Sequence, residues 1–342
     1  MQLIATSILA IFLGLKFIQH LVERRLTGVN RNYYMTEAKR KNAQDVLGIS
    51  AEDMEKTLSY SEDRYAFGRI SSWVGFIIVN GLLAAGCLGL FESFAVKLTG
   101  GGSIVTGLVF FALLGLGAQV IGLSFELYRV FKIEEKHGFN RQTLKGFILD
   151  RIKGLAIAMV LGGLIMSLIL WIMEAAGSFW WVYAWAAMRG FSILTAWLYP
   201  ALLAPLFNKF SPVEGELSKK INDLASKIGF TTAGIYIMDA SKRSSHGNAY
   251  FTGVFGKKRI VLFDTLVEAM SSNEVVAVLA HELGHFKLKH VRWQLIRGVL
   301  TTGFIFYLLS LCLPLEKFYS AFFQAGFLPR MKKIIRLNHP IG

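Results

Sequence analysis

The sequence predicts a mainly α-helical, polytopic membrane protein with a small α/β soluble portion. Three observations support this fold class. The chain has 342 residues, of which 54% are hydrophobic, and its mean hydropathy is +0.47. Its apolar residues are concentrated in blocks of about 20 residues, a length that matches the roughly 30 Å hydrocarbon core of a bilayer. One segment, 206–293, instead alternates patterns typical of helices and strands.

The apolar blocks predict six membrane spans. The first lacks a small-residue cleavage site after its basic end, so we expect an uncleaved anchor. Pro200 and Pro205 should end or kink the fifth span, because proline cannot continue an α-helix. The six spans are predicted at about 2–22, 72–95, 103–125, 154–173, 179–205 and 294–314.

The net charge of +14 follows the predicted loops. Lys and Arg number nine in 23–71, seven in 126–153 and twelve in 206–293, whereas 96–102 and 174–178 together contain only Lys97. This alternation is the positive-inside pattern, and it predicts a cytoplasmic segment 206–293 with the N-terminus outside. No nucleic-acid-binding module accompanies the basic residues, so we expect membrane lipid and not nucleic acid as a partner.

The predicted spans divide the chain into three parts. Residues 1–205 form membrane helices with cytoplasmic loops, 206–293 form the soluble portion, and 294–342 hold the sixth span and a basic tail. In the first loop, Ser50 should cap a short cytoplasmic helix. Two cysteines, Cys87 and Cys312, fall within predicted spans and form no CxxC pair, so we interpret them as apolar packing residues.

The soluble portion begins with an amphipathic helix in GELSKKINDLASKIGF that Gly229 should close. Strands are predicted at 234–239, 249–255 and 258–264, with a hairpin turn at Gly256 and Lys257. Ser271 and Glu274 then have the spacing of a capping box, which predicts that a helix starts there. That helix contains VVAVLAHELGHFKLKH.

Two imidazoles and one carboxylate interrupt this otherwise apolar helix. His281 and His285 are four residues apart and therefore share a helical face, which suits two ligands of a tetrahedral metal. Glu282 lies where it can reach a water on the metal rather than the metal itself. This HExxH arrangement is typical of zinc-dependent hydrolases, in which zinc lowers the pKa of water to about 7 and the glutamate takes its proton. We interpret His290 as a surface residue or the partner of a ligand.

A strand beside such a helix can hold a peptide substrate as an added strand. The best candidate is NAYFTGVF, of which Asn248, Ala249 and Tyr250 lie nearest the preceding loop; an ordinary hairpin strand is the alternative. A second polar group, Glu134 with Glu135 and His137, lies in FKIEEKHGFNRQT. We interpret it as a solvated or ion-paired surface rather than a set of ligands.

Several stretches together resemble the integral-membrane zinc metalloproteases of the type I CAAX prenyl endopeptidase family. They are RSSHGNAYFTGVFGKKRIVLFDTLVEAM, VLAHELGHFKLKH, FKIEEKHGFNRQT, YPALLAPLFNKFSPVEGEL and IYIMDASKRSSH. The resemblance implies a helical membrane barrel around a chamber and a zincin-like site. It implies that His281 and His285 bind zinc, that Glu282 is the catalytic base, and that the strand from Asn248 lies along the substrate.

The C-terminal part departs from this family pattern. The resemblance implies a third zinc ligand, a glutamate well downstream of HELGH. After His285 the sequence has no Asp and only one Glu, Glu316, which should lie across the membrane from the histidines. The tail LPRMKKIIRLNHPIG is basic where the positive-inside pattern expects few charges. We therefore expect a truncated or altered C-terminus.

The leading functional hypothesis is a membrane-embedded zinc endopeptidase that cleaves near the C-terminus of prenylated, CAAX-type or other membrane-associated peptides. A membrane quality-control protease is a second possibility. The third is a catalytically impaired protein that binds peptide or lipid, because two histidines without a third ligand should hold zinc weakly.

Overall fold

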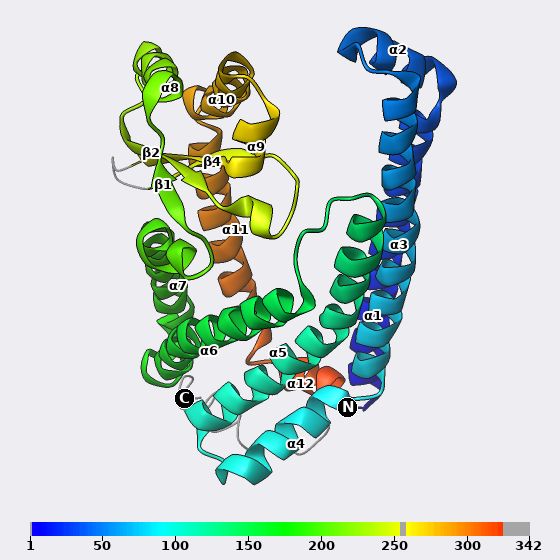
Figure 1. Cartoon of the computed structure of the whole chain (residues 1–342). Helices are drawn as coiled ribbons and strands as arrows, with labels where there is room; N and C mark the ends of the chain where they lie inside the picture. Colours follow the sequence, from blue (N-terminus) through cyan, green and yellow to red (C-terminus); the bar gives the residue numbers. More distant parts are fainter. Residues whose placement is uncertain (1, 254–257, 324–342) are drawn as a thin grey trace. The chain divides into compact units, whose positions relative to one another are not determined.

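Figure 1 shows a computed structural model of the chain, which describes residues 2–253 and 258–323. The chain divides into two units. One comprises Met1–His137 and Ser310–Gly342, and the other comprises Gly138–Leu309. The predicted turn at Gly256–Lys257 and the basic tail lie outside the described residues.

The first unit is helical throughout its described elements. Helix α1 packs against α3 and the short α12, and α4 packs against α5. The elements are α1 (Gln2–Met35), α2 (Glu37–Leu47), α3 (Ala51–Ala84), α4 (Cys87–Thr99), α5 (Ser103–Tyr128), a π-helix η1 (Arg129–Glu134) and α12 (Glu316–Phe322).

The second unit combines long helices with a small sheet. Helix α11 (His290–Cys312) begins in this unit, and its residues from Ser310 onward are assigned to the first unit. The remaining helices are α6 (Leu144–Ala175), α7 (Trp180–Leu198), α8 (Gly215–Lys227), α9 (Asp264–Ala269) and α10 (Ser272–Lys287), with short turns η2 (Gly177–Phe179), η3 (Tyr199–Leu203), η4 (Ala204–Leu206) and η5 (Ala240–Lys242). The strands are β1 (Phe210–Pro212), β2 (Thr232–Met238), β3 (Ala249–Thr252) and β4 (Lys258–Phe263).

Five described helices are long and apolar enough to cross a membrane. They overlap five of the six predicted spans, and helix α7 lies within the fifth, 179–205, without belonging to that set. Its sequence, WWVYAWAAMRGFSILTAWL, includes Arg189 and several tryptophans among its apolar residues. As predicted, α7 ends just before Pro200. The five are Ile4–Met35, Ala51–Ala84, Ser103–Glu134, Leu144–Ala175 and His290–Cys312.

The second predicted span has the wrong boundaries. The apolar pattern predicted one helix over 72–95, but α3 ends at Ala84 and α4 begins at Cys87. Gly86 lies between them at φ 71°, a left-handed conformation that ends the first helix and that glycine adopts without steric cost. Ser50 does cap α3, since its Oγ accepts the Asp53 N–H at 3.0 Å, but the helix continues through the membrane segment instead of ending within the loop.

The polar residues of FKIEEKHGFNRQT are paired with α3. Both carboxylate oxygens of Glu134 accept the Tyr60 hydroxyl, at 2.9 and 3.0 Å. His137 Nε2 and Lys136 Nζ both lie 2.6 Å from Asp63 Oδ2. These contacts agree with an ion-paired surface that joins η1 to α3.

The sheet has the order β1-β2-β4-β3, which places β3 at one edge. Figure 1 labels the other three strands. Strand β2 runs parallel to β4, and both outer strands run antiparallel to their neighbours. The predicted strands at 234–239, 249–255 and 258–264 correspond to β2, β3 and β4. The sequence did not reveal β1, because only three residues pair with β2.

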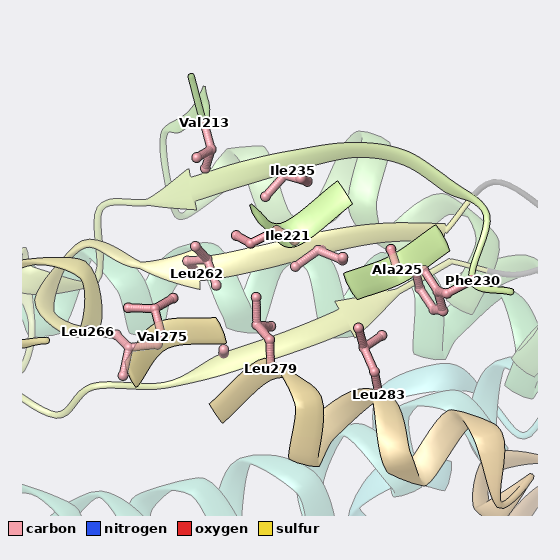
Figure 2. Packing of buried hydrophobic residues seen from close by; sticks show 12 residues of the cluster. Val213, Ile221, Ala225, Phe230, Ile235, Leu262, Leu266, Val275, Leu279 and Leu283 are labelled. Atoms are coloured by element: carbon pink, nitrogen blue, oxygen red, sulfur yellow. The ribbon is translucent and has the colours of Figure 1, made fainter. Parts of the chain in front are cut away.

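One face of this sheet is covered by α8 and α10, and their apolar side chains form the main core (Figure 2). Leu279 and Leu283 of α10 and Ile221 of α8 are at most 1% exposed. They pack with Ile260 and Leu262, neither of which is exposed. Full burial of one such side chain contributes about 1.5–3 kcal/mol. The core therefore holds α10 against β3 and β4.

Leu279→Ala should weaken this packing. Removing a buried leucine side chain leaves a cavity and typically lowers the free energy of unfolding by about 2–5 kcal/mol. Pulse proteolysis of the full chain in detergent with increasing urea measures the change. Leu288→Ala is the matched control, because Leu288 is 64% exposed. Equal losses in the two variants would contradict the packing.

Candidate active site

Helix α10 begins with the capping box that the sequence predicts. The Ser271 Oγ accepts the Glu274 N–H at 3.4 Å, and the Glu274 carboxylate accepts the Ser271 N–H at 2.8 Å. Hydrogen bonds from the Ser271 side chain and backbone lower the pKa of Glu274. The carboxylate therefore stays charged at the positive end of the helix, which fixes where the helix starts.

The apolar stripe of α10 determines where its polar residues lie. Val275, Leu279 and Leu283 recur every fourth residue and are buried against the sheet. His281 and His285 form a second stripe with the same spacing on a different part of the helix surface. His281 is exposed and His285 is partly exposed. The site thus lies on a rigid helix without occupying its core.

The two predicted metal ligands are close together. The rings of His281 and His285 have centroids 5.0 Å apart and an interplanar angle of 83°. Their edge-to-face arrangement presents two imidazoles from successive turns, as the HExxH spacing predicts. Glu282, the residue after His281, is partly exposed.

His290 contacts His285 although it follows the end of α10. The Nδ1 atoms of the two rings are 2.8 Å apart, so one donates a hydrogen bond and the other accepts it. Lys289 adopts φ 57° between α10 and α11 and turns the chain so that His290 can approach. This bond leaves Nε2 of His285 available to a metal, and ligand histidines usually have such a partner at their other nitrogen. The contact supports our interpretation of His290 as the partner of a ligand.

A zinc site of three protein ligands is not complete within residues 2–253 and 258–323, where no group of three His, Cys, Asp or Glu side chains is placed to hold a metal. Catalytic zinc sites normally use three protein ligands. His281 and His285 nevertheless fit two nitrogen positions of such a site. The described residues therefore provide a partial donor set.

Within residues 2–253 and 258–323, one edge of the candidate substrate strand β3 has no pairing strand and is open. The Asn248 carbonyl accepts the Phe263 N–H at 2.9 Å, and Ala249 stands opposite Leu262. Hydrogen-bonding directions alternate along an antiparallel pair, so Ala249 and Phe251 direct their backbone groups away from β4. The Asn248 Oδ1 accepts the Ala249 N–H at 2.8 Å. The Ala249 carbonyl and both Phe251 backbone groups face the open edge.

The side chains of the predicted substrate residues do not form one surface. Asn248 is exposed, whereas Ala249 is 4% exposed and packs in the core beneath α10. Tyr250 points to the opposite face of the sheet, where it packs against Phe263. Burial, with a smaller contribution from Tyr199, raises the pKa of Tyr250 to about 12. Because the three side chains lie on different surfaces, a single peptide could contact all three residues only through their backbone atoms.

A basic side chain stabilises the C-terminal part of α10. Lys258 Nζ lies 3.9 Å from the ring centroid of Phe286 and 5.1 Å from that of Phe230. Burial lowers the pKa of Lys258. Its contact with Phe286, the residue after His285, ties the histidine turn to β4.

Sequence reasoning missed the residues that hold the loop before β3. Arg243 and Asp150 form an ion pair with an N–O distance of 2.7 Å, across 93 positions of the chain. No local pattern links residues so far apart. The only signal in the sequence was a basic residue, Arg243, in the loop between two predicted strands.

Long apolar helices and a HELGH helix beside the edge of a sheet define a multi-pass integral membrane protein with a metallopeptidase-type segment. The chain matches the family model "CAAX prenyl protease N-terminal, five membrane helices" over residues 31–209 and "Peptidase family M48" over residues 212–339. The chain belongs to the CAAX prenyl protease 1 family, whose members join a membrane N-terminal domain to an M48 domain.

Known relatives match most of this chain. A CAAX prenyl protease 1 homolog of Arabidopsis thaliana is 40% identical over 256 residues, covering 72% of this chain and 60% of the relative. One from Taenia solium is 34% identical over 324 residues, covering 83% and 68%. The crystal structure of S. mikatae Ste24p superposes with a TM-score of 0.84 at 32% identity, covering 98% of this chain and 81% of that one. The match to the plant relative thus spans about three fifths of its length.

Proposed function

We propose that this protein is a membrane-embedded zinc metalloendopeptidase that cleaves near the C-terminus of prenylated, CAAX-type peptides. The observation that carries the proposal is the HELGH geometry: two imidazoles and a glutamate lie on one capped helix, packed beside an open strand edge, in a member of the M48 family. The relatives' name, CAAX prenyl protease, supports the substrate class.

His281 and His285 would bind the metal. Bound zinc supplies a Lewis acid that lowers the pKa of water to about 7 and polarises a peptide carbonyl. His290 holds the His285 ring through its Nδ1 contact and thereby orients the other nitrogen. A third ligand would complete the site.

Glu282 is the general base. It follows His281 directly, so its carboxylate stands next to the metal position without occupying it. The carboxylate accepts a proton from the water that attacks the peptide carbonyl and transfers it to the departing amine. Positioned general acid–base groups typically contribute factors of about 10² to 10⁴ in rate.

Strand β3 holds the substrate by its backbone. An extended peptide beside β3 would donate to the Ala249 carbonyl and pair with both backbone groups of Phe251. Because these contacts involve no side chain of the substrate, they suit peptides of varied sequence. Lipid and lipidated peptide are the expected partners, and the basic loops favour a cytoplasmic HELGH segment with the N-terminus outside.

A catalytically impaired membrane protein that binds peptide or lipid is the second candidate. It is favoured by the partial donor set, since the described residues supply no group of three ligands. Such a protein would bind a prenylated peptide without cleaving it. The next two experiments separate the candidates.

His285→Ala should remove most of the bound zinc. Its imidazole provides half of the described donor set, so loss of one ligand should reduce zinc per chain to near background. His290→Ala should weaken zinc binding by about 10- to 100-fold, because it removes only the partner of the ligand. Mass spectrometry of metal in the purified full chain measures both. His246→Ala is the control outside α10, and unchanged zinc in His285→Ala would rule out the proposed metal site.

Glu282→Gln should slow cleavage strongly and leave zinc in place. The amide cannot accept a proton from water, so the rate constant for hydrolysis of a farnesylated peptide should fall by about 10² to 10⁴. Chromatography of the peptide products measures the rate. Glu268→Gln, an exposed change on α9, should retain activity. Wild-type binding without cleavage would support the impaired protein instead.

N-methylation of the substrate should reveal backbone pairing with β3. Methylating successive amides of a farnesylated peptide, one at a time, should lower kcat/KM at alternate positions only. Each lost hydrogen bond is worth about 0.5–1.5 kcal/mol, or about two- to tenfold. Steady-state kinetics with the methylated series measures the effect. A uniform effect along the peptide would argue against strand pairing.

A further inference from the structure

The loop that precedes β3 is held by polar contacts on several sides. Residues 239–248 leave β2 and must deliver β3 to the far side of β4, with only the short turn η5 as regular structure. A mobile loop would leave the start of β3 undefined. The contacts that hold residues 239–248 in place therefore also determine where β3 begins.

Arg243 is the main connection of this loop to the rest of the second unit. Its Nε donates to Asp150 Oδ2 of α6 at 2.7 Å. Its Nη1 donates to Asn208 Oδ1 at 2.5 Å, and its Nη2 donates to the Phe207 carbonyl at 2.8 Å. One planar guanidinium thus joins the loop to a long helix and to the segment between η4 and β1. Lysine cannot reproduce this fork of donors.

The backbone on either side of Arg243 is paired with residues 138–141. The Arg243 carbonyl accepts the Arg141 N–H at 3.1 Å, and the Ser245 N–H donates to the Phe139 carbonyl at 3.1 Å. The His246 ring stacks on Phe139 with centroids 4.2 Å apart. This short antiparallel contact holds the loop in an extended conformation up to His246.

Residues near both ends of the loop are attached to α9. The Thr265 hydroxyl donates to the His246 carbonyl at 2.9 Å, and Asp264 accepts the Ser241 N–H at 2.9 Å. Partial burial raises the pKa of Asp264, but hydrogen bonds from Ser241 and Thr265 outweigh it and lower the pKa overall. Gly247 passes so close to Leu266 that an added Cβ would lie 3.3 Å from its Cα.

We propose that Arg243 is a positioning residue: through its contacts with Asp150, Phe207 and Asn208 it fixes the loop that sets the position of β3 beside the HELGH helix. The inference rests on the proposed function, because a positioned edge strand has value only for a bound peptide. Arg243 itself contacts neither the histidines nor the open edge. Its loss should therefore weaken peptide binding and spare the metal site.

Arg243→Lys tests this role. It keeps the charge but replaces three separate donor nitrogens with one, which cannot reach all three acceptors, so KM for a farnesylated peptide should rise about tenfold. We expect zinc content and kcat to stay within about twofold of wild type, since α10 keeps its own core contacts. Arg141→Lys is the matched control, because the loop uses only the backbone of Arg141. The double variant Asp150→Ala/Arg243→Ala should be no worse than Arg243→Ala alone.

Hydrogen exchange of the full chain is the second measurement and needs no cleavage. In Arg243→Lys the amides of 244–252 should exchange about tenfold faster, whereas those of Val275–Leu283 should not change. Unchanged exchange and KM would overturn the proposal, and so would a joint loss of zinc, kcat and α10 protection. If the wild type cleaves nothing, the proposed function fails. The exchange data and the Kd for the farnesylated peptide then decide whether Arg243 positions the strand.

Discussion

The packing of α10 against the sheet is the constraint on which the candidate site depends. Val275, Leu279 and Leu283 bury one stripe of the helix against the sheet. Because side chains four residues apart share a face, this burial forces His281 and His285 onto another part of the helix surface. The helix cannot rotate to hide the imidazoles without exposing its leucines. The same contact brings β3, the edge strand, beside the helix that carries the glutamate.

A second set of forces, mostly polar, controls the edge strand itself. Ala249 anchors β3 in the core, and hydrogen bonds of Arg243, Asp264 and Thr265 hold the loop before it. Apolar packing therefore determines where the proposed metal ligands lie, and hydrogen bonds determine where the proposed peptide-binding edge begins. A substitution in the apolar core and a substitution in the loop before β3 should therefore have separate effects, the first on α10 and the second on the edge strand.

Local patterns predicted the features that depend on neighbours in the sequence. The capping box at Ser271, the shared face of His281 and His285, and the strand pair β3–β4 all follow from spacings of one to four residues or a short turn. Features that depend on distant residues or on one backbone angle were missed. The Arg243–Asp150 pair spans 93 positions. Gly86 interrupts a stretch whose composition predicts one continuous membrane helix. For His290 the sequence left two interpretations open, a surface residue or the partner of a ligand, because its approach to His285 depends on the left-handed turn at Lys289.

X-ray absorption at the zinc edge tests the central claim most directly, because it reports which atoms surround the metal in the full chain. The HELGH helix predicts two imidazole nitrogens at about 2.0–2.1 Å, with any further ligands being oxygen or nitrogen. Substituting His281 or His285 should remove one imidazole contribution from the spectrum. Sulfur ligands at about 2.3 Å, or a wild-type spectrum without imidazole, would contradict the assignment of this helix as the metal-binding element.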